Sequence, residues 1–342
     1  MPAEPRPRRR YVTFAIIAVL VSTVFSVLAL LGVDFWLHKR YEKRWGLNVW
    51  GYRGEVVGRK QTGEFRLVVV GGSTALGFGL PAEQAFPGQL QRLLKARPGG
   101  AGAVSVVNLA YNAEGAYSFA HTLRDYDYLA YDAALLYTGV NDLGGPNRQV
   151  FRRDSGVFRL TGYYFMLPQV LRERALFIRY GGDMDAAARG EKVVFTPNAR
   201  ERTAAAALEA AAKITRSIEN QLGQQDTERT SGPGDSGCGA RWDFYCGAVA
   251  RAVEETLARG RRVIVVSEPY VTDVQADQQR ALAAMLQRRF AGRPGWSHVD
   301  LGRAVDVREP AIAFDGMHLT GPGNAIIAAR LVEPVTAAMD RN

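Results

Sequence analysis

Residues 68–74 constrain the fold more than any other part of the chain, because they read Val-Val-Val-Gly-Gly-Ser-Thr. Three consecutive valines predict a strand that is covered on both faces, as strands of parallel sheets are. The two glycines permit a tight turn, so Ser73 is expected at the carboxyl end of the strand, where open α/β sheets place their ligands. Gly-Gly-Ser is also common loop material, so this run indicates a site only together with other segments.

Strand and helix patterns alternate from Phe65 to the end of the chain, which predicts an α/β domain over residues 65–342 with a doubly wound parallel sheet flanked by helices. The expected strands are residues 66–70, 104–109, 133–137, 262–267 and 298–301. The expected helices are residues 85–95, 116–128, 246–259 and 274–290, with a final helix after Gly323.

An insertion interrupts this alternation at about residues 144–239. It contains an aromatic patch at residues 163–165, an Ala-rich helical run near residues 200–222 and a polar stretch at residues 224–237. The insertion could overhang the site as a lid, or it could be a peripheral packing element, and the sequence leaves both open.

An uncharged apolar segment occupies residues 12–33, before the α/β region. At about 1.5 Å per residue it spans roughly 33 Å, which is enough to cross the hydrocarbon core of a bilayer. Tyr11 and Trp36 flank it as interfacial aromatic residues would. A cleavable signal peptide is the alternative, but its apolar core would be about half as long, and no cleavage motif of small residues precedes Asp34. We therefore expect a transmembrane helix between a cytoplasmic tail (residues 1–11) and a juxtamembrane connector (residues 34–64).

The formal net charge is +9, yet the dense basic stretches at residues 6–10 and 39–44 flank the apolar segment. This arrangement favours anionic lipid headgroups over nucleic acid as the partner of the basic residues. A short basic tail usually stays in the cytoplasm, so the long domain is expected outside the cytoplasm, anchored in the inner membrane. Cys238 and Cys246 could form a disulfide there, or remain two unpaired thiols.

Three later segments support the interpretation that Ser73 belongs to a functional site. Residues 108–115 end in Gly115, residues 139–142 read Gly-Val-Asn-Asp, and residues 315–318 read Asp-Gly-Met-His. Together with residues 71–74 they resemble, in order and rough spacing, the four sequence blocks of the SGNH (GDSL-type) hydrolases, a family of serine esterases. The resemblance covers most of the chain from Phe65 onwards, outside the insertion. One departure is that the Gly-Asp-Ser-Leu of the founding members reads Gly-Gly-Ser-Thr here, which bears on subgroup more than on chemistry.

A serine hydroxyl is a poor nucleophile until a neighbouring base takes its proton and a third group orients that base. Among the four histidines, only His318 belongs to an Asp-x-x-His motif, in a loop before the final helix. The resemblance implies that His318 deprotonates Ser73 and that Asp315 orients His318. The remaining histidines are more often structural in such positions: His38, His121 and His298.

The tetrahedral intermediate of an ester hydrolysis also needs donors aimed at its oxyanion. The resemblance assigns this oxyanion hole to the N–H groups of Ser73 and Gly115 and to the side chain of Asn141. Gly115 could instead merely relieve a turn, and Asn141 could cap a helix. Asp142 is expected to be a structural partner.

The sequence therefore predicts a serine esterase that acts without a cofactor on acylated carbohydrate or lipid, with short acyl groups on envelope or extracellular carbohydrate as the first expectation. Two alternatives remain open: a glycan O-acyltransferase with the same triad, and a catalytically idle, membrane-anchored subunit that binds glycans or assists assembly. No metal site is expected, because two cysteines and four scattered histidines make no ligand cluster. A phosphate-binding loop at residues 72–79 is excluded by Phe78, which stands where the lysine would be.

Overall fold

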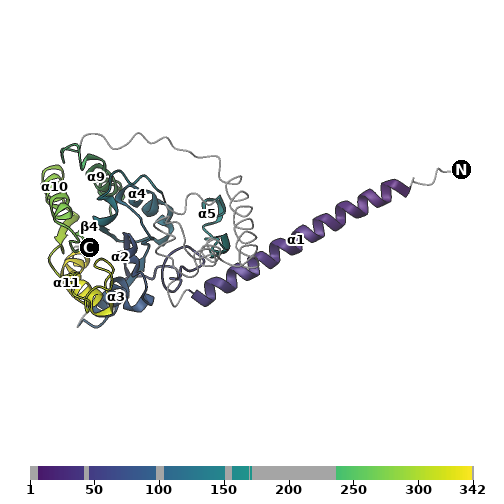
Figure 1. Ribbon diagram of the computed structural model, residues 1–342, viewed down its shortest axis with the longest axis horizontal. Coiled ribbons are helices and arrows are strands. Elements are labelled where there is room, and N and C mark those ends of the chain that lie inside the picture. The colour runs from purple at the N-terminus through teal and green to yellow at the C-terminus, as the bar shows by residue number, and fades with distance from the viewer. Residues whose placement is uncertain are drawn as a thin grey trace, which may run out of the picture. The chain divides into compact units, whose positions relative to one another are not determined.

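The computed structural model describes residues 7–41, 46–97, 104–150, 156–168, 170–171 and 236–340 (Figure 1). The chain divides into two compact units. The first comprises Met1–Arg40 and Phe165–Arg216, and the second comprises Tyr41–Tyr164 and Ser217–Asn342.

The second unit is built on a five-stranded parallel sheet with the strand order β2-β1-β3-β4-β5. The strands are β1 (Phe65–Gly71), β2 (Val104–Asn108), β3 (Ala133–Thr138), β4 (Arg262–Ser267) and β5 (Trp296–Asp300). The chain passes from β1 to β2 on one side and then returns to β3 on the other, so the strand order reverses at β1. Open α/β sheets bind their ligands at such a reversal, beyond the carboxyl ends of the strands.

The central strands β1 and β3 are buried along their whole length, as expected for a sheet covered on both faces. Leu67, Val68, Val69 and Val70 have no exposed surface. The register pairs Gly71 with Tyr137, so β1 and β3 end at nearly the same level. The predicted doubly wound parallel sheet is confirmed.

Helices cover both faces of this sheet, because successive right-handed crossovers that run in opposite directions place their helices on opposite faces. One layer is α3 (Phe86–Lys95) packed on α11 (Gly321–Met339), and the other is α4 (Ala116–Asp125) packed on α9 (Asp243–Ala258). Figure 1 shows these two pairs, with α10 (Asp273–Arg289) beside α9. The helix expected over residues 116–128 ends at Asp125, because its C-cap Tyr126 has a non-helical backbone (φ −101°, ψ 19°), and a separate 3₁₀ turn follows at Asp127–Leu129.

In the first unit, α1 (Pro7–Tyr41) contains the apolar segment and is long and apolar enough to cross a membrane. The helix runs further than the expected span of residues 12–33, so the segment expected as a connector begins as helix. Asp34 and His38 are fully buried near its end. The Asp34 carboxylate accepts a hydrogen bond from the Leu167 N–H at 2.6 Å and lies 3.4 Å from His38 Nε2.

Beyond α1, the described part of the expected connector, residues 46–64, belongs to the second unit. Tyr52 and Arg53 are buried, and the Arg53 N–H donates to the Asn108 carbonyl at 2.9 Å. Arg53 thereby forms isolated antiparallel bridges with Asn108 and with Leu47. The segment around Arg53 is thus attached to Asn108, the last residue of β2.

Most of the expected insertion lies outside the described residues, including the Ala-rich run near residues 200–222. Its described parts include α5 (Gly156–Thr161) and Tyr164, whose hydroxyl lies 2.5 Å from that of Tyr111. At its end, Cys238 and Cys246 form a disulfide that ties the preceding loop to the first turn of α9.

Candidate active site

Three of the predicted site residues meet beyond the carboxyl end of β1. Ser73 is the first residue of α2 (Ser73–Leu76), which follows β1 through Gly72. His318 Nε2 lies 2.8 Å from Ser73 Oγ, and His318 Nδ1 lies 2.5 Å from Asp315 Oδ2. In the tautomer that suits both contacts, Nδ1–H donates to the carboxylate and Nε2 accepts from the serine hydroxyl. This geometry can withdraw a proton from Ser73.

The loop before α11 holds Asp315 in a fixed orientation. Asp315 Oδ1 accepts hydrogen bonds from the backbone N–H groups of Met317 at 3.0 Å and His318 at 2.7 Å. Partial burial alone would raise the pKa of Asp315, but the hydrogen bonds from the His318 side chain and from these two N–H groups lower it below its ordinary value. Asp315 therefore stays ionised and can stabilise a positive charge on His318.

Two phenylalanines lie against the imidazole of His318. The Phe78 ring centroid is 4.8 Å from that of His318, and the Phe314 ring is stacked on it at 5.8 Å. Phe78 is 46% exposed and Phe314 is 49% exposed, so both present an apolar face to whatever approaches the imidazole. Gly79 has a positive φ of 77°, and a side chain there would come within 3.3 Å of the Phe314 ring.

Asn141 brings a third segment to the site. It follows β3 in the 3₁₀ turn Val140–Asp142, and its Nδ2 donates to the Glu114 carbonyl at 3.1 Å. A Cβ atom on Gly72 would lie only 1.9 Å from this Nδ2, so the amide lies directly against the turn that precedes Ser73. Asn141 caps none of the described helices, and its amide nitrogen has a second N–H beyond the bond to Glu114.

Gly115, the fifth predicted residue, is the N-cap of α4. A side chain at this position would collide with Asn147 and Asp142, because both have atoms within 2.9 Å of the place that a Cβ would take. Asp142 Oδ2 accepts from the Ala116 N–H at 3.0 Å, which holds the start of α4 against the turn after β3. The expected structural role of Asp142 agrees with this contact.

Two polar residues in the site were not predicted from the sequence. Asn147 Nδ2 donates to the carbonyls of Ala113 at 3.0 Å and Asn141 at 3.3 Å, which joins the loops that carry Gly115 and Asn141. Glu268, directly after β4, accepts a hydrogen bond from the Thr74 hydroxyl at 2.6 Å. A single Asn or Glu has no sequence signature, although the position of Glu268 at the end of a buried strand could have marked it.

Burial raises the pKa of both acidic residues beneath the site. The pKa of Glu268 is raised to about 7 by burial, against the hydrogen bonds from Thr74 and Val140. The pKa of Asp142 is also raised to about 7, mainly by burial and further by the charge of Glu268, against the bond from Ala116. Among the described residues, Asp142 Oδ1 has no hydrogen-bond partner, which leaves its charge poorly stabilised.

Two other histidines of the second unit, His121 and His298, have partners of their own. His121 is buried in α4, where Arg124 lies 3.1 Å from its Nδ1, and His298 Nε2 lies 3.1 Å from Ser267 Oγ in β4. Burial lowers the pKa of His298 despite the nearby charge of Asp300. No group of three His, Cys, Asp or Glu side chains within the described ranges could hold a metal ion.

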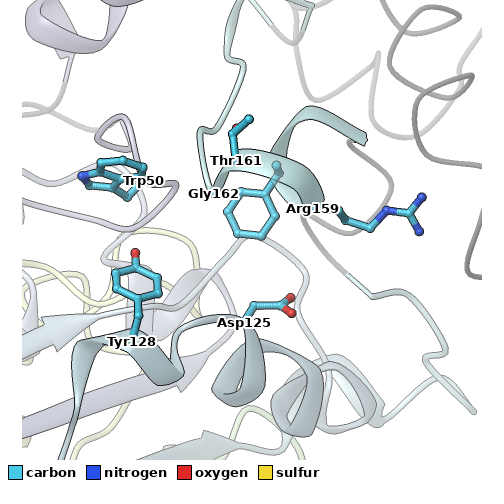
Figure 2. Close-up of a pocket in the computed structure, with 7 residues that line it drawn as sticks. Trp50, Asp125, Tyr128, Arg159, Thr161 and Gly162 are labelled. Carbon is cyan, nitrogen blue, oxygen red and sulfur yellow. The ribbon is translucent and has the colours of Figure 1, made fainter.

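A cavity of about 560 Å³ lies elsewhere in the second unit, and Ser73, Asp315 and His318 do not line it. Figure 2 shows it between the end of α4 and α5. Its labelled lining residues are Trp50, Asp125, Tyr128, Arg159, Thr161 and Gly162.

No protein-family model and no curated protein matches the chain. Among solved structures, it is similar to a putative lipolytic protein of the G-D-S-L family from Desulfitobacterium hafniense DCB-2, with 12% identity, a TM-score of 0.39, and coverage of 78% of this chain and 98% of that one. It is also similar to the psychrotrophic esterase EstA from Pseudoalteromonas sp., with 9% identity, a TM-score of 0.42, and coverage of 80% and 98%. A third similar structure is Axe2, an acetylxylan esterase from Geobacillus stearothermophilus, with 12% identity, a TM-score of 0.43, and coverage of 79% and 94%. At these TM-scores the similarity assigns neither an activity nor a substrate to this chain.

The raised pKa values predict how stability depends on pH. Between about pH 4 and about pH 7, Asp142 and Glu268 hold protons in the folded protein that they would release when unfolded, so the folded state binds more protons. The free energy of unfolding should therefore fall as the pH rises through this window and level off above it. Denaturant titrations of the wild type and of Glu268→Gln between about pH 4 and about pH 7 measure the free energy of unfolding, which should decline less steeply with pH in the variant. Equal slopes in the two proteins would contradict the raised pKa of Glu268.

Proposed function

We propose that this chain is a serine esterase in which Ser73, His318 and Asp315 form the catalytic triad. The observation that carries the proposal is the continuous chain of contacts from Ser73 Oγ to His318 Nε2 at 2.8 Å and from His318 Nδ1 to Asp315 at 2.5 Å. A nucleophile that contacts a base, with the base oriented by a carboxylate, is the arrangement that acyl transfer requires.

In the proposed reaction, Ser73 Oγ attacks the ester carbonyl while His318 Nε2 takes the hydroxyl proton. The ionised Asp315 stabilises the imidazolium that forms, and His318 then gives the proton to the departing alcohol. Water repeats the sequence on the acyl-enzyme, so that the acid leaves and Ser73 is restored. The oxyanion would be held by the N–H groups of Ser73 and Gly115 and by the second N–H of Asn141, which the bond to Glu114 holds in place.

We propose short acyl esters of carbohydrate as the substrate class. Phe78 and Phe314 support an alcohol portion with an apolar face, because their half-exposed rings flank the imidazole that must protonate that alcohol.

We also propose that α1 anchors the protein in the inner membrane and that the sheet domain lies outside the cytoplasm. The candidate span Tyr11–Arg40 has a mean hydropathy of 2.8 over its most apolar window. The Cys238–Cys246 disulfide supports the placement, since disulfides persist mainly in oxidising compartments.

Removal of either Ser73 or His318 should abolish ester hydrolysis in a folded protein. We expect Ser73→Ala and His318→Ala to lower kcat for p-nitrophenyl acetate by about 10⁴-fold or more, and the double variant to lose little beyond either single variant. Acetate release from acetylated glycans, scored in parallel with transfer to glycan acceptors, separates hydrolysis from acyl transfer. His298→Gln is the control and should change stability alone. Full activity in folded Ser73→Ala would refute the mechanism.

The contact between Gly72 and Asn141 predicts that a methyl group on Gly72 displaces the Asn141 amide. Gly72 has an ordinary φ of −83°, so Gly72→Ala should fold, and the side chain of Asn141 should move away from the new Cβ. We expect Gly72→Ala and Asn141→Ala each to lower kcat by about 100- to 1000-fold with little change in KM.

The double variant Gly72→Ala/Asn141→Ala should be no slower than Asn141→Ala, because the displaced amide is already absent. Gly144→Ala is the matched control, since a Cβ there meets open space. Independent, multiplying losses in the double variant would show that Gly72 acts on activity by another route.

The proposed topology predicts where a fusion partner becomes active. A reporter that works only outside the cytoplasm, fused after Asn342, should be active, and Cys238 and Cys246 should resist alkylation until a reductant is added. Activity of only a cytoplasmic reporter, together with two freely alkylated thiols, would reverse the assignment.

A further inference from the structure

Glu268 lies between the two turns that carry Ser73 and Asn141. It directly follows β4, is 1% exposed, and its backbone N–H donates to the Thr138 carbonyl at the end of β3 at 3.2 Å. Its carboxyl group is therefore held at the carboxyl edge of the sheet, within reach of the turns that leave β1 and β3.

Each oxygen of this carboxyl group contacts a different turn. Glu268 Oε2 accepts from the Thr74 hydroxyl at 2.6 Å, and Oε1 accepts from the Val140 N–H at 3.4 Å. Thr74 is the residue after Ser73, and Val140 is the residue before Asn141. One buried side chain thus joins the turn of the nucleophile to the turn of the expected oxyanion donor.

We propose that Glu268 is a positioning residue that holds these two turns at the spacing the reaction needs. The proposal rests on the serine-esterase function proposed above and adds a residue outside the triad and the oxyanion hole. Productive sites hold their catalytic groups within about 0.5 Å of the geometry that the reaction needs, and a displacement of about 1 Å can lower the rate about 100-fold.

Fold stability alone does not account for a carboxyl group at this place. Burial raises its pKa to about 7, and its charge raises the pKa of three described neighbours that are acidic or phenolic: Asp142, Tyr137 and Tyr245. An apolar side chain of similar volume is often as stable as a buried charge or more so. What an apolar side chain cannot do is accept the hydrogen bonds of Thr74 and Val140 together.

Glu268→Leu in the full-length protein separates positioning from stability. We expect its melting temperature to match or exceed that of the wild type, while kcat for p-nitrophenyl acetate falls by about 10- to 100-fold at nearly unchanged KM. Glu268→Gln can still bond to both turns and should recover about tenfold or more of the lost rate. Labelling of Ser73 by a fluorophosphonate should slow in parallel with kcat.

Thr74→Val gives the second single variant of a double-mutant cycle with Glu268→Leu. It removes one of the two hydrogen bonds and leaves Glu268 in place. The double variant Thr74→Val/Glu268→Leu should be no slower than Glu268→Leu alone. Ser267→Ala is the matched control: it removes a neighbouring buried hydrogen bond to Gln279 at 2.8 Å, so it should lower the melting temperature and leave kcat unchanged. If Glu268→Leu fails to fold, the proposal is tested instead on Thr74→Val and Glu268→Gln, by measuring kcat and the rate of Ser73 labelling in each.

Wild-type kcat and labelling rate in folded Glu268→Leu, or in folded Thr74→Val where that variant decides, would overturn the positioning role. So would a rate loss in Ser267→Ala as large as that in Glu268→Leu. A wild-type protein that is not labelled at Ser73 would instead refute the proposed serine-esterase function, so the two failures are distinguishable.

Discussion

The geometry of the candidate site depends on the level at which three parallel strands end. The register aligns Gly71 of β1 with Tyr137 of β3, and Thr138 of β3 with Ser267 of β4. Because parallel strands release their chains at the same edge, the residues that follow these strands meet there without any long connection. The turns of Ser73 and Asn141 and the carboxyl group of Glu268 are brought together in this way, whereas Asp315 and the imidazole of His318 come from the distant loop before α11.

Bringing these groups together costs folding free energy, mainly through the desolvation of buried polar groups. Asp142 and Glu268 are desolvated under the site, and their mutual repulsion further raises the pKa of Asp142. Each carboxyl group nevertheless bonds to a backbone N–H of a site loop, Ala116 for Asp142 and Val140 for Glu268. A less polar core would be easier to stabilise, but it would leave these loops without partners that fix their separation.

Much of the fold could be predicted because its signals are local. The apolar run of residues 262–267 coincides with β4, and the other strands differ from expectation by one or two residues at one or both ends. Helix ends were less predictable, since α4 ends at the non-helical Tyr126 and a 3₁₀ turn follows it, and no residue in this stretch signals the change. Asn147 and Glu268 were missed because their importance comes from partners far away in the sequence.

The sequence by itself determined the alternating elements, the long apolar helix and the residue types able to perform acyl transfer, because periodicity and short motifs depend only on chain neighbours. The tertiary structure alone decided which groups touch: His318 with Ser73 across 245 positions, Glu268 with Thr74 across 194, and the amide of Asn141 with Gly72. Such contacts follow from strand register and from the packing of layers, and these are properties of the whole sheet that no local run of residues encodes.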